Sequence, residues 1–172
     1  SFGVNNAQVG AILSAFAFAR FASGLFSGKL VDVFGERLVY TIGVGFVALS
    51  SFAAAFSQSY EQLLFYRAAG GLGSSMFSVA AGSIILRATD DTHRARAQSL
   101  YNASFLVGMM AGPVIGGFLT AISLRAPLLV YAALLVVSSA AGGFLLRNSV
   151  LAARPTEKIV NEKGSMREAL SS

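Results

Sequence analysis

Five long apolar stretches, each joined to the next by a short polar connection, constrain the fold of this chain more than any other feature. A helix needs about 20 mainly apolar residues to cross a bilayer, and every stretch has that length. The stretches are 8–27, 38–57, 63–86, 97–121 and 127–146. None of them alternates apolar and polar residues, which argues against a β-barrel. We therefore expect an all-α, polytopic transmembrane helix bundle that is compact and runs up and down.

Composition supports a membrane protein. Charged residues make up 12% of the chain, about half of the roughly 25% that is usual in soluble domains. The chain has no cysteine, which excludes a disulfide scaffold and a cysteine metal site. A net charge of +5 would also fit a nucleic-acid-binding protein, but the basic residues lie between apolar stretches. We therefore expect the lipid bilayer as a partner, and no nucleic acid, cofactor or metal.

The basic residues of the connections fall on one side. Lys and Arg mark the cytoplasmic side of short loops, and only Arg125 lies on the opposite side. The basic residues on the common side are Lys29, Arg37, Arg87, Arg94, Arg96, Arg147, Arg154, Lys158, Lys163 and Arg167. This bias predicts a multi-pass protein of the cell membrane with its first residues outside. The weakly hydrophobic segment 148–172 is then a cytoplasmic linker.

The connection between the first two stretches carries both glycines and charge. Gly28 and Gly35 favour a tight turn. Asp32 lies just inside the membrane surface, where Lys29, Arg37 or a helix N-terminus would be its partner. The alternative is an ordinary solvated turn.

Two arginines lie inside the apolar stretches. A charge in hydrocarbon costs several kcal/mol unless it reaches the interface, a partner or a water-filled cavity. Arg20 lies mid-span, so we expect it to face the interior and to touch substrate or a carboxylate, the alternative being a structural ion pair. Arg67 lies near an outer end, where snorkelling competes with a functional role. Gly71, Ser74, Ser78 and Gly82 share the face of Arg67, which suits close packing or a cavity.

The fourth stretch has a ridge without large side chains, formed by Ser104, Gly108, Gly112 and Gly116. Another helix can approach such a ridge closely. Pro113 predicts a kink, and the adjacent Gly117 adds local freedom. A bent, tightly packed helix with no further role is the alternative.

The chain offers no enzyme site. Its single histidine, His93, lies outside the apolar stretches, so an intramembrane serine–histidine pair is not available. We predict no catalytic residue.

Three of these segments resemble signatures of the major facilitator superfamily of transporters. The first is Gly-x-Leu-x-Asp-Arg-x-Gly-Arg-Arg, from which Val33 and Glu36 depart. The second is Arg-x-x-x-Gly-x-Gly, and the third is an antiporter signature from which Ser99 departs upstream. The matching residues are Gly28, Leu30, Asp32, Gly35 and Arg37; Arg67, Gly71 and Gly73; and Gly108, Gly112, Pro113, Gly116 and Gly117.

The resemblance implies both a fold and a function. The five spans would be helices two to six of a twelve-helix carrier, so that helix one and the C-terminal half are missing partners and the fragment alone does not transport. The implied function is proton-coupled efflux of small molecules by alternating access. Asp32 and Arg37 would then form a cytoplasmic gate, Arg67 would serve proton coupling, and the glycine–proline helix would shape the contact between halves. The alternatives are an uptake symporter for a small metabolite or sugar, and a non-transporting scaffold or truncated product.

Overall fold

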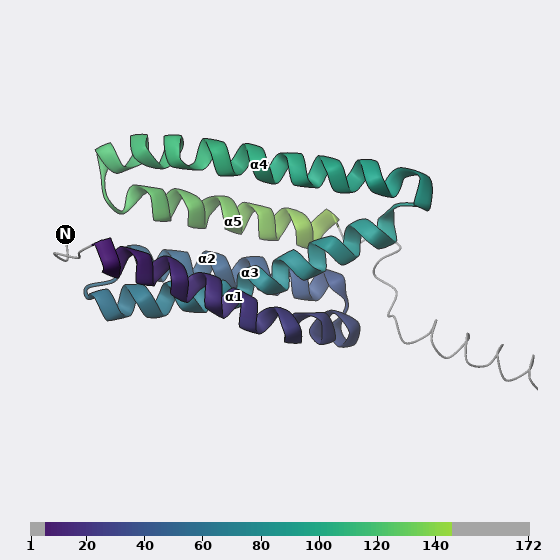
Figure 1. Cartoon of the computed structure of the whole chain (residues 1–172), viewed down its shortest axis with the longest axis horizontal. Coiled ribbons are helices and arrows are strands. Elements are labelled where there is room, and N and C mark those ends of the chain that lie inside the picture. The colour runs from purple at the N-terminus through teal and green to yellow at the C-terminus, as the bar shows by residue number, and fades with distance from the viewer. Residues whose placement is uncertain (1–5, 146–172) are drawn as a thin grey trace, which may run out of the picture.

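The computed structural model describes residues 6–145, and these form five α-helices and no strand (Figure 1). Each helix is long and apolar enough to cross a membrane. The all-α, multi-spanning fold class is therefore confirmed. The helices are α1 (Asn6–Phe34), α2 (Glu36–Ala55), α3 (Tyr60–Ala88), α4 (Asp91–Ile122) and α5 (Ala126–Leu145). The expected linker 148–172 lies outside the described residues.

Helices α1 and α4 extend well beyond the apolar stretches, because the charged segments 28–34 and 91–96 continue as helix. The α1–α2 connection shrinks to Gly35, whose φ of +82° is the left-handed conformation that glycine adopts without strain. We expected Gly28 to be part of this turn, but it lies within α1. At the other end of α2, the side chain of Ser59 caps α3 by accepting a hydrogen bond from the backbone N–H of Gln62 at 3.2 Å.

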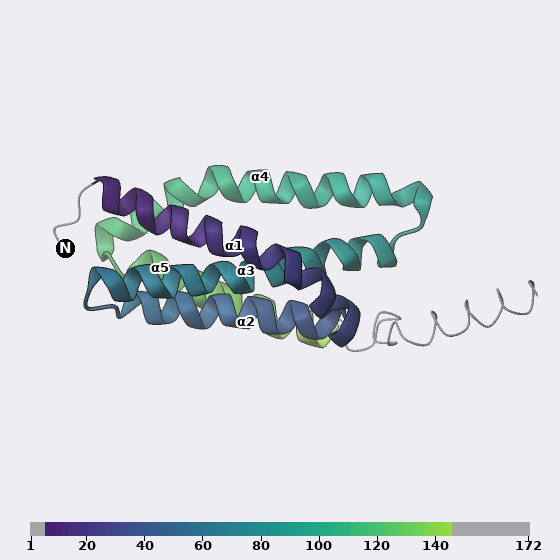
Figure 2. The same cartoon turned by 60° about the horizontal axis from the view of Figure 1, so that its bottom comes forward.

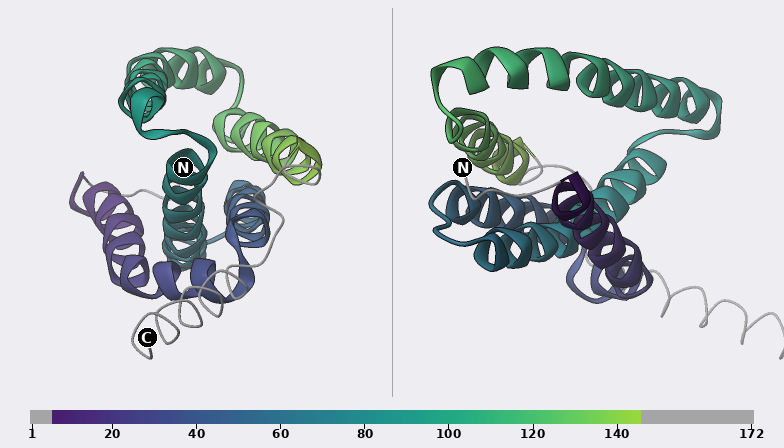
Figure 3. Two further views of the ribbon diagram at one scale, coloured as in Figure 1. Left: turned by 90° about the vertical axis from the view of Figure 1, so that its right-hand side faces the viewer. Right: turned by 60° about the vertical axis from the view of Figure 1, so that its left-hand side comes forward.

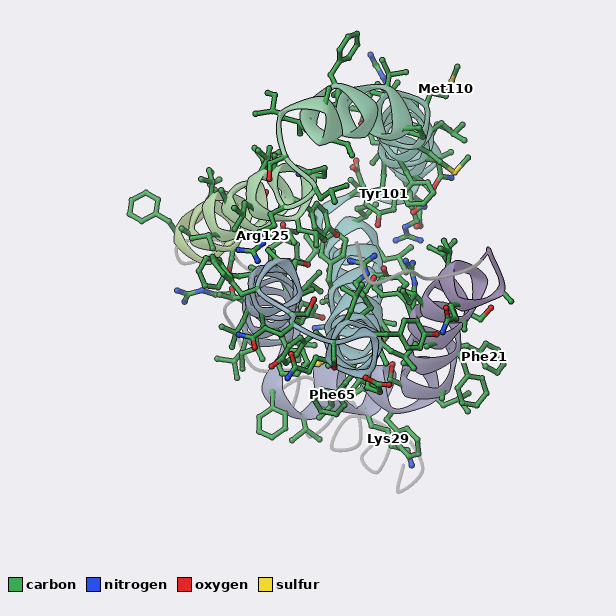
Figure 4. The ribbon with its side chains drawn as sticks, turned by 90° about the vertical axis from the view of Figure 1, so that its left-hand side faces the viewer. Phe21, Lys29, Phe65, Tyr101, Met110 and Arg125 are labelled. Carbon is green, nitrogen blue, oxygen red and sulfur yellow. The ribbon has the colours of Figure 1, made fainter. Side chains whose placement is uncertain are left out.

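Helix α3 is the centre of the packed part of the molecule. It lies between α1 and α2, and α5 packs on the other side of α2 (Figures 2 and 3). Small residues permit these close contacts: a β-carbon added at Gly73 would lie 2.7 Å from the carbonyl oxygen of Gly43 on α2. Large side chains instead point outward, as Phe21, Phe65 and Met110 do in Figure 4. Such a surface suits contact with lipid.

Helix α4 departs from the expected compact bundle. It stands apart from α1, α2 and most of α3, and none of its residues is buried (Figure 1). The expectation of a compact bundle is therefore wrong for this helix. The physical reason is that its small-residue ridge has no neighbouring helix among residues 6–145. The helix runs without interruption through Pro113, and the kink angle stays a prediction.

The helices alternate in direction, so their connections gather at two ends (Figure 1). Lys29, Arg37, Arg87, Arg94 and Arg96 lie at or near the end that holds the α1–α2 and α3–α4 connections. Arg125 lies at the opposite end, where its guanidinium stacks 5.7 Å from the ring centre of Phe56. Among the described residues, basic side chains outside the helix middles therefore gather at one end of the molecule, with Arg125 as the exception.

Candidate functional site

The seam between α1 and α3 holds a charged side chain in the middle of the molecule. Arg20 on α1 donates from Nη1 to the hydroxyl of Ser74 at 3.2 Å and from Nη2 to the hydroxyl of Ser78 at 3.0 Å. Both serines lie on α3, one turn apart. The guanidinium therefore bridges two helices through neutral acceptors, in place of the carboxylate that the sequence led us to consider.

A ladder of serines continues this seam. The hydroxyl of Ser75 lies 2.7 Å from that of Ser23 and 3.0 Å from that of Ser27, so both residues of α1 share hydrogen bonds with it. Ser27 and Ser75 are almost fully buried. Hydroxyl bonds between helices are worth about 1 kcal/mol each in a membrane. Together they fix the register of α1 against α3.

Glycine lets the two helices come close enough for these bonds. A β-carbon added at Gly71 would lie 2.5 Å from the carbonyl oxygen of Phe16 and 3.1 Å from the backbone nitrogen of Arg20. Both neighbours are backbone atoms, so a side chain at this position would push α1 away from α3. Gly71 is thus a packing residue of the seam, and Gly73 has the same role against α2.

Arg67 lies on the same seam, nearer the N-terminal end of α3. Its guanidinium carbon lies 5.1 Å from the centre of the Phe16 ring, within the range of a cation–π contact. Within residues 6–145 it makes no ion pair. The structure therefore places the two intramembrane arginines on one interface, a juxtaposition that the sequence alone did not reveal.

The described helices carry no acid near their middles. Their acids lie in or next to a terminal turn, at Asp32, Glu36, Glu61, Asp90 and Asp91. The α1–α3 seam is consequently positive, with two cations and no carboxylate in the part of the chain that the structure describes. Within residues 6–145, neither arginine of the seam has a carboxylate partner.

The first signature segment, around the α1–α2 connection, makes other contacts than we expected. Glu36, which departs from the signature, is only 1% exposed, and its Oε1 lies 2.7 Å from Nε of Arg87 at the end of α3. Neither carboxylate oxygen of Glu36 receives a hydrogen bond of good geometry from the described chain. The attraction of opposite charges is therefore the main polar contact that ties the start of α2 to the end of α3.

Arg37, the residue after Glu36, connects the start of α2 to a third helix, α5. Arg37 donates from Nε to the backbone carbonyl of Gly143, in the last turn of α5, at 3.2 Å. A cation near the C-terminus of a helix also interacts favourably with the helix dipole. Asp32, in contrast, is exposed and makes no ion pair or hydrogen bond with residues 6–145. The structure thus separates Asp32 from Arg37 instead of pairing them.

The glycine ridge of α4 is open. A β-carbon added at Gly108, Gly112, Gly116 or Gly117 would meet no atom within 4 Å. These residues and Pro113 share a helix that the rest of the described chain leaves uncovered. The ridge is therefore available to a further helix.

The sequence matches a known family over this whole arrangement. A sequence model of the Major Facilitator Superfamily matches residues 1–171. The chain belongs to this superfamily of membrane transporters. It is therefore a multi-pass membrane protein of a transporter family and not an enzyme, as its signatures predicted.

Individual relatives show the same relationship. The chain is 27% identical to the Quinolone resistance protein NorA of Staphylococcus aureus strain MRSA252 over 125 residues, which is 73% of the chain and 32% of NorA. It is 23% identical to Multidrug resistance protein 2 of Bacillus subtilis strain 168 over 147 residues, which is 86% of the chain and 37% of that protein. The chain thus spans about a third of the length of these relatives.

Sequence reasoning missed two parts of the site. It treated Glu36 as a weakness of the signature, although an acid and a base at the adjoining ends of α2 and α3 are a signal for a pair. It also missed that Ser74 and Ser78 hold Arg20, because their spacing places them on one face without showing which helix they meet.

Proposed function

We propose that the full-length protein exports small molecules in exchange for protons by alternating access. The observation that carries this proposal is the open ridge of α4, whose Gly108-x-x-x-Gly112-Pro113-x-x-Gly116-Gly117 pattern is that of the antiporter signature. The names of the relatives, which refer to quinolone and multidrug resistance, support export. In this proposal the ridge packs against the second half of the carrier, and substrate binds between the halves near the bilayer midplane.

The other signature residues take roles that fit their positions. Asp32 and Arg37 act at the cytoplasmic gate, where Arg37 secures the end of α5. Asp32, which has no ion-pair partner within residues 6–145, contacts the second half. Arg67 acts in proton coupling by favouring the ionised form of a carboxylate on another helix. The residues before α1 face the outside, and the chain ends in the cytoplasm.

Accumulation in inverted membrane vesicles tests the function. Vesicles that contain the full-length protein and have an acid lumen should accumulate a quinolone, and a protonophore should abolish the accumulation. Vesicles with the Gly112→Leu variant, whose new side chain meets nothing within the described helices, should hold the same amount of protein but lose transport. Accumulation that persists without a proton gradient would indicate a differently coupled carrier, and equilibration without accumulation would indicate a facilitator. Release of preloaded quinolone driven by the gradient would indicate a symporter.

A further inference from the structure

Arg20 carries a charge that the described chain holds in place but does not neutralise. It lies at the centre of α1, which is 29 residues long. At a rise of 1.5 Å per residue, Arg20 lies about 10 Å from the nearer end of the apolar stretch 8–27. Its guanidinium is held between the two helices by Ser74 and Ser78, so the charge lies within the apolar part of the seam.

The hydrogen bonds that Arg20 makes within residues 6–145 use only part of its donor capacity. Ser74 and Ser78 each take one N–H, from different terminal nitrogens, whereas a guanidinium has five N–H donors. The two hydroxyls are neutral, so they orient the guanidinium and leave its charge intact. An oriented guanidinium with N–H groups that no residue of 6–145 accepts suits a carboxylate, which can accept two parallel hydrogen bonds from it.

The surroundings favour an anion over a cation. Arg67 adds a second positive charge to the seam, above the ring of Phe16. The acids of residues 6–145 all lie at or near helix ends. A cationic group near Arg20 would therefore be repelled, while an anionic group would gain from both arginines in a medium where charges are weakly screened.

We propose that Arg20 is the anion-binding residue of the substrate site and takes the carboxylate of a small organic substrate. The inference rests on the proposed transport function and names the substrate class of the same site. Ser74 and Ser78 are positioning residues that aim the guanidinium. A carboxylate supplied permanently by another helix of the protein is the competing account.

Binding of three matched probes to the purified full-length protein tests the inference without any gradient. The probes are 2-naphthoate, 2-naphthylmethanol and 2-naphthylmethylammonium, which share one ring system and differ in charge. Equilibrium dialysis should show that naphthoate binds at least about tenfold more tightly than the alcohol. Arg20→Gln should remove that preference and leave the affinity for the ammonium probe equal or higher. Arg20→Lys, which keeps the charge but loses the planar fork, should retain part of the preference.

Two controls secure the result. Arg125→Gln changes an arginine at the outer end that stacks on Phe56, and it should leave all three affinities unchanged. Ser74→Ala combined with Ser78→Ala keeps the charge of Arg20 and should weaken naphthoate binding by about threefold, the scale of one net hydrogen bond.

The outcomes separate this inference from the proposed function. Equal binding of naphthoate and alcohol to the unmodified protein overturns it, even if no Arg20 variant folds. Naphthoate binding that survives Arg20→Gln also overturns it and favours a permanent partner for Arg20. Either result leaves proton-driven export standing, because that is measured in vesicles. If the unmodified protein binds naphthoate through Arg20 but shows no proton-driven export in vesicles, the proposed function is refuted and the anion site stands.

Discussion

At the scale of single residues, the two members of the ion pair between Glu36 and Arg87 differ in burial. Glu36 is almost completely buried, whereas the side chain of its partner Arg87 is 42% exposed. Removing one member of a buried pair is costly when the member left behind is a buried charge. The carboxylate, and not the guanidinium, is therefore the group that depends on the pair.

This asymmetry makes a prediction about stability. Arg87→Met strands the carboxylate of Glu36 and should lower the free energy of unfolding by about 3–5 kcal/mol. Glu36→Gln leaves an arginine that water can reach and should cost less. The double variant with Glu36→Arg and Arg87→Glu should recover part of the loss. Thermal unfolding of the full-length protein in detergent measures all three.

A second arginine provides the matched control for that series. Arg94 is equally exposed at 42%, but its partner Asp91, 2.8 Å away, is 89% exposed. Exposed pairs contribute at most about 1 kcal/mol, so Arg94→Met should have little effect. Equal losses in Arg87→Met and Arg94→Met would show that the Glu36 pair has no special role.

Asp32 makes a prediction about transport. It is exposed and has no ion-pair partner in the described chain, so Asp32→Asn should leave thermal stability unchanged. If Asp32 contacts the second half at the cytoplasmic gate, the same variant should reduce the transport rate at least about tenfold. Asp91→Asn at the same end should keep normal transport. Normal transport in Asp32→Asn would mean that the residue has no role at the gate.

At the scale of helices, glycine decides how closely elements approach. Gly71 meets the backbone of α1, whereas Gly82 on the same helix has nothing within 4 Å of an added β-carbon. Gly71→Ala should therefore force α1 outward and stretch the bonds from Arg20 to Ser74 and Ser78. Overpacking of this kind costs about 1–3 kcal/mol.

The identical change at Gly82 serves as the control. Gly82→Ala should be neutral or stabilising by up to about 1 kcal/mol, because alanine favours helix. Thermal unfolding compares the two variants directly. A Gly71→Ala protein as stable as Gly82→Ala would contradict the close α1–α3 contact.

The elements also show what the sequence could predict. The length and apolarity of the stretches were sufficient to predict five helices, because a membrane span needs a long, mainly apolar stretch. They were insufficient for the ends of α1, α3 and α4, where polar turns such as those around Asp32 and His93 continue the helix. Length and apolarity also did not predict which helices pack against one another. The open ridge of α4 and the pair of Glu36 with Arg87 depend on tertiary contacts that no local pattern contains.

At the scale of the whole molecule, charge at the two ends predicts the orientation. Residues near the α2–α3 connection should face the outside, and those near the α3–α4 connection should face the cytoplasm. In an otherwise cysteine-free full-length protein, an impermeant thiol reagent should label Ser59→Cys in intact cells. It should label Thr92→Cys only after the cells are opened. The reverse pattern would overturn the topology.

The central claim, that the full-length protein exports small molecules in exchange for protons, is tested most directly by measuring the proton movement that substrate causes. Inverted vesicles with an acid lumen and a trapped pH-sensitive dye should show a rise in lumen pH when a quinolone is added outside, because export carries protons out of the lumen. Arg67→Ala should abolish this proton flux, and Arg67→Lys should retain part of it if charge alone matters. Uptake of quinolone without any change in lumen pH, or a normal flux in Arg67→Ala, would contradict the account.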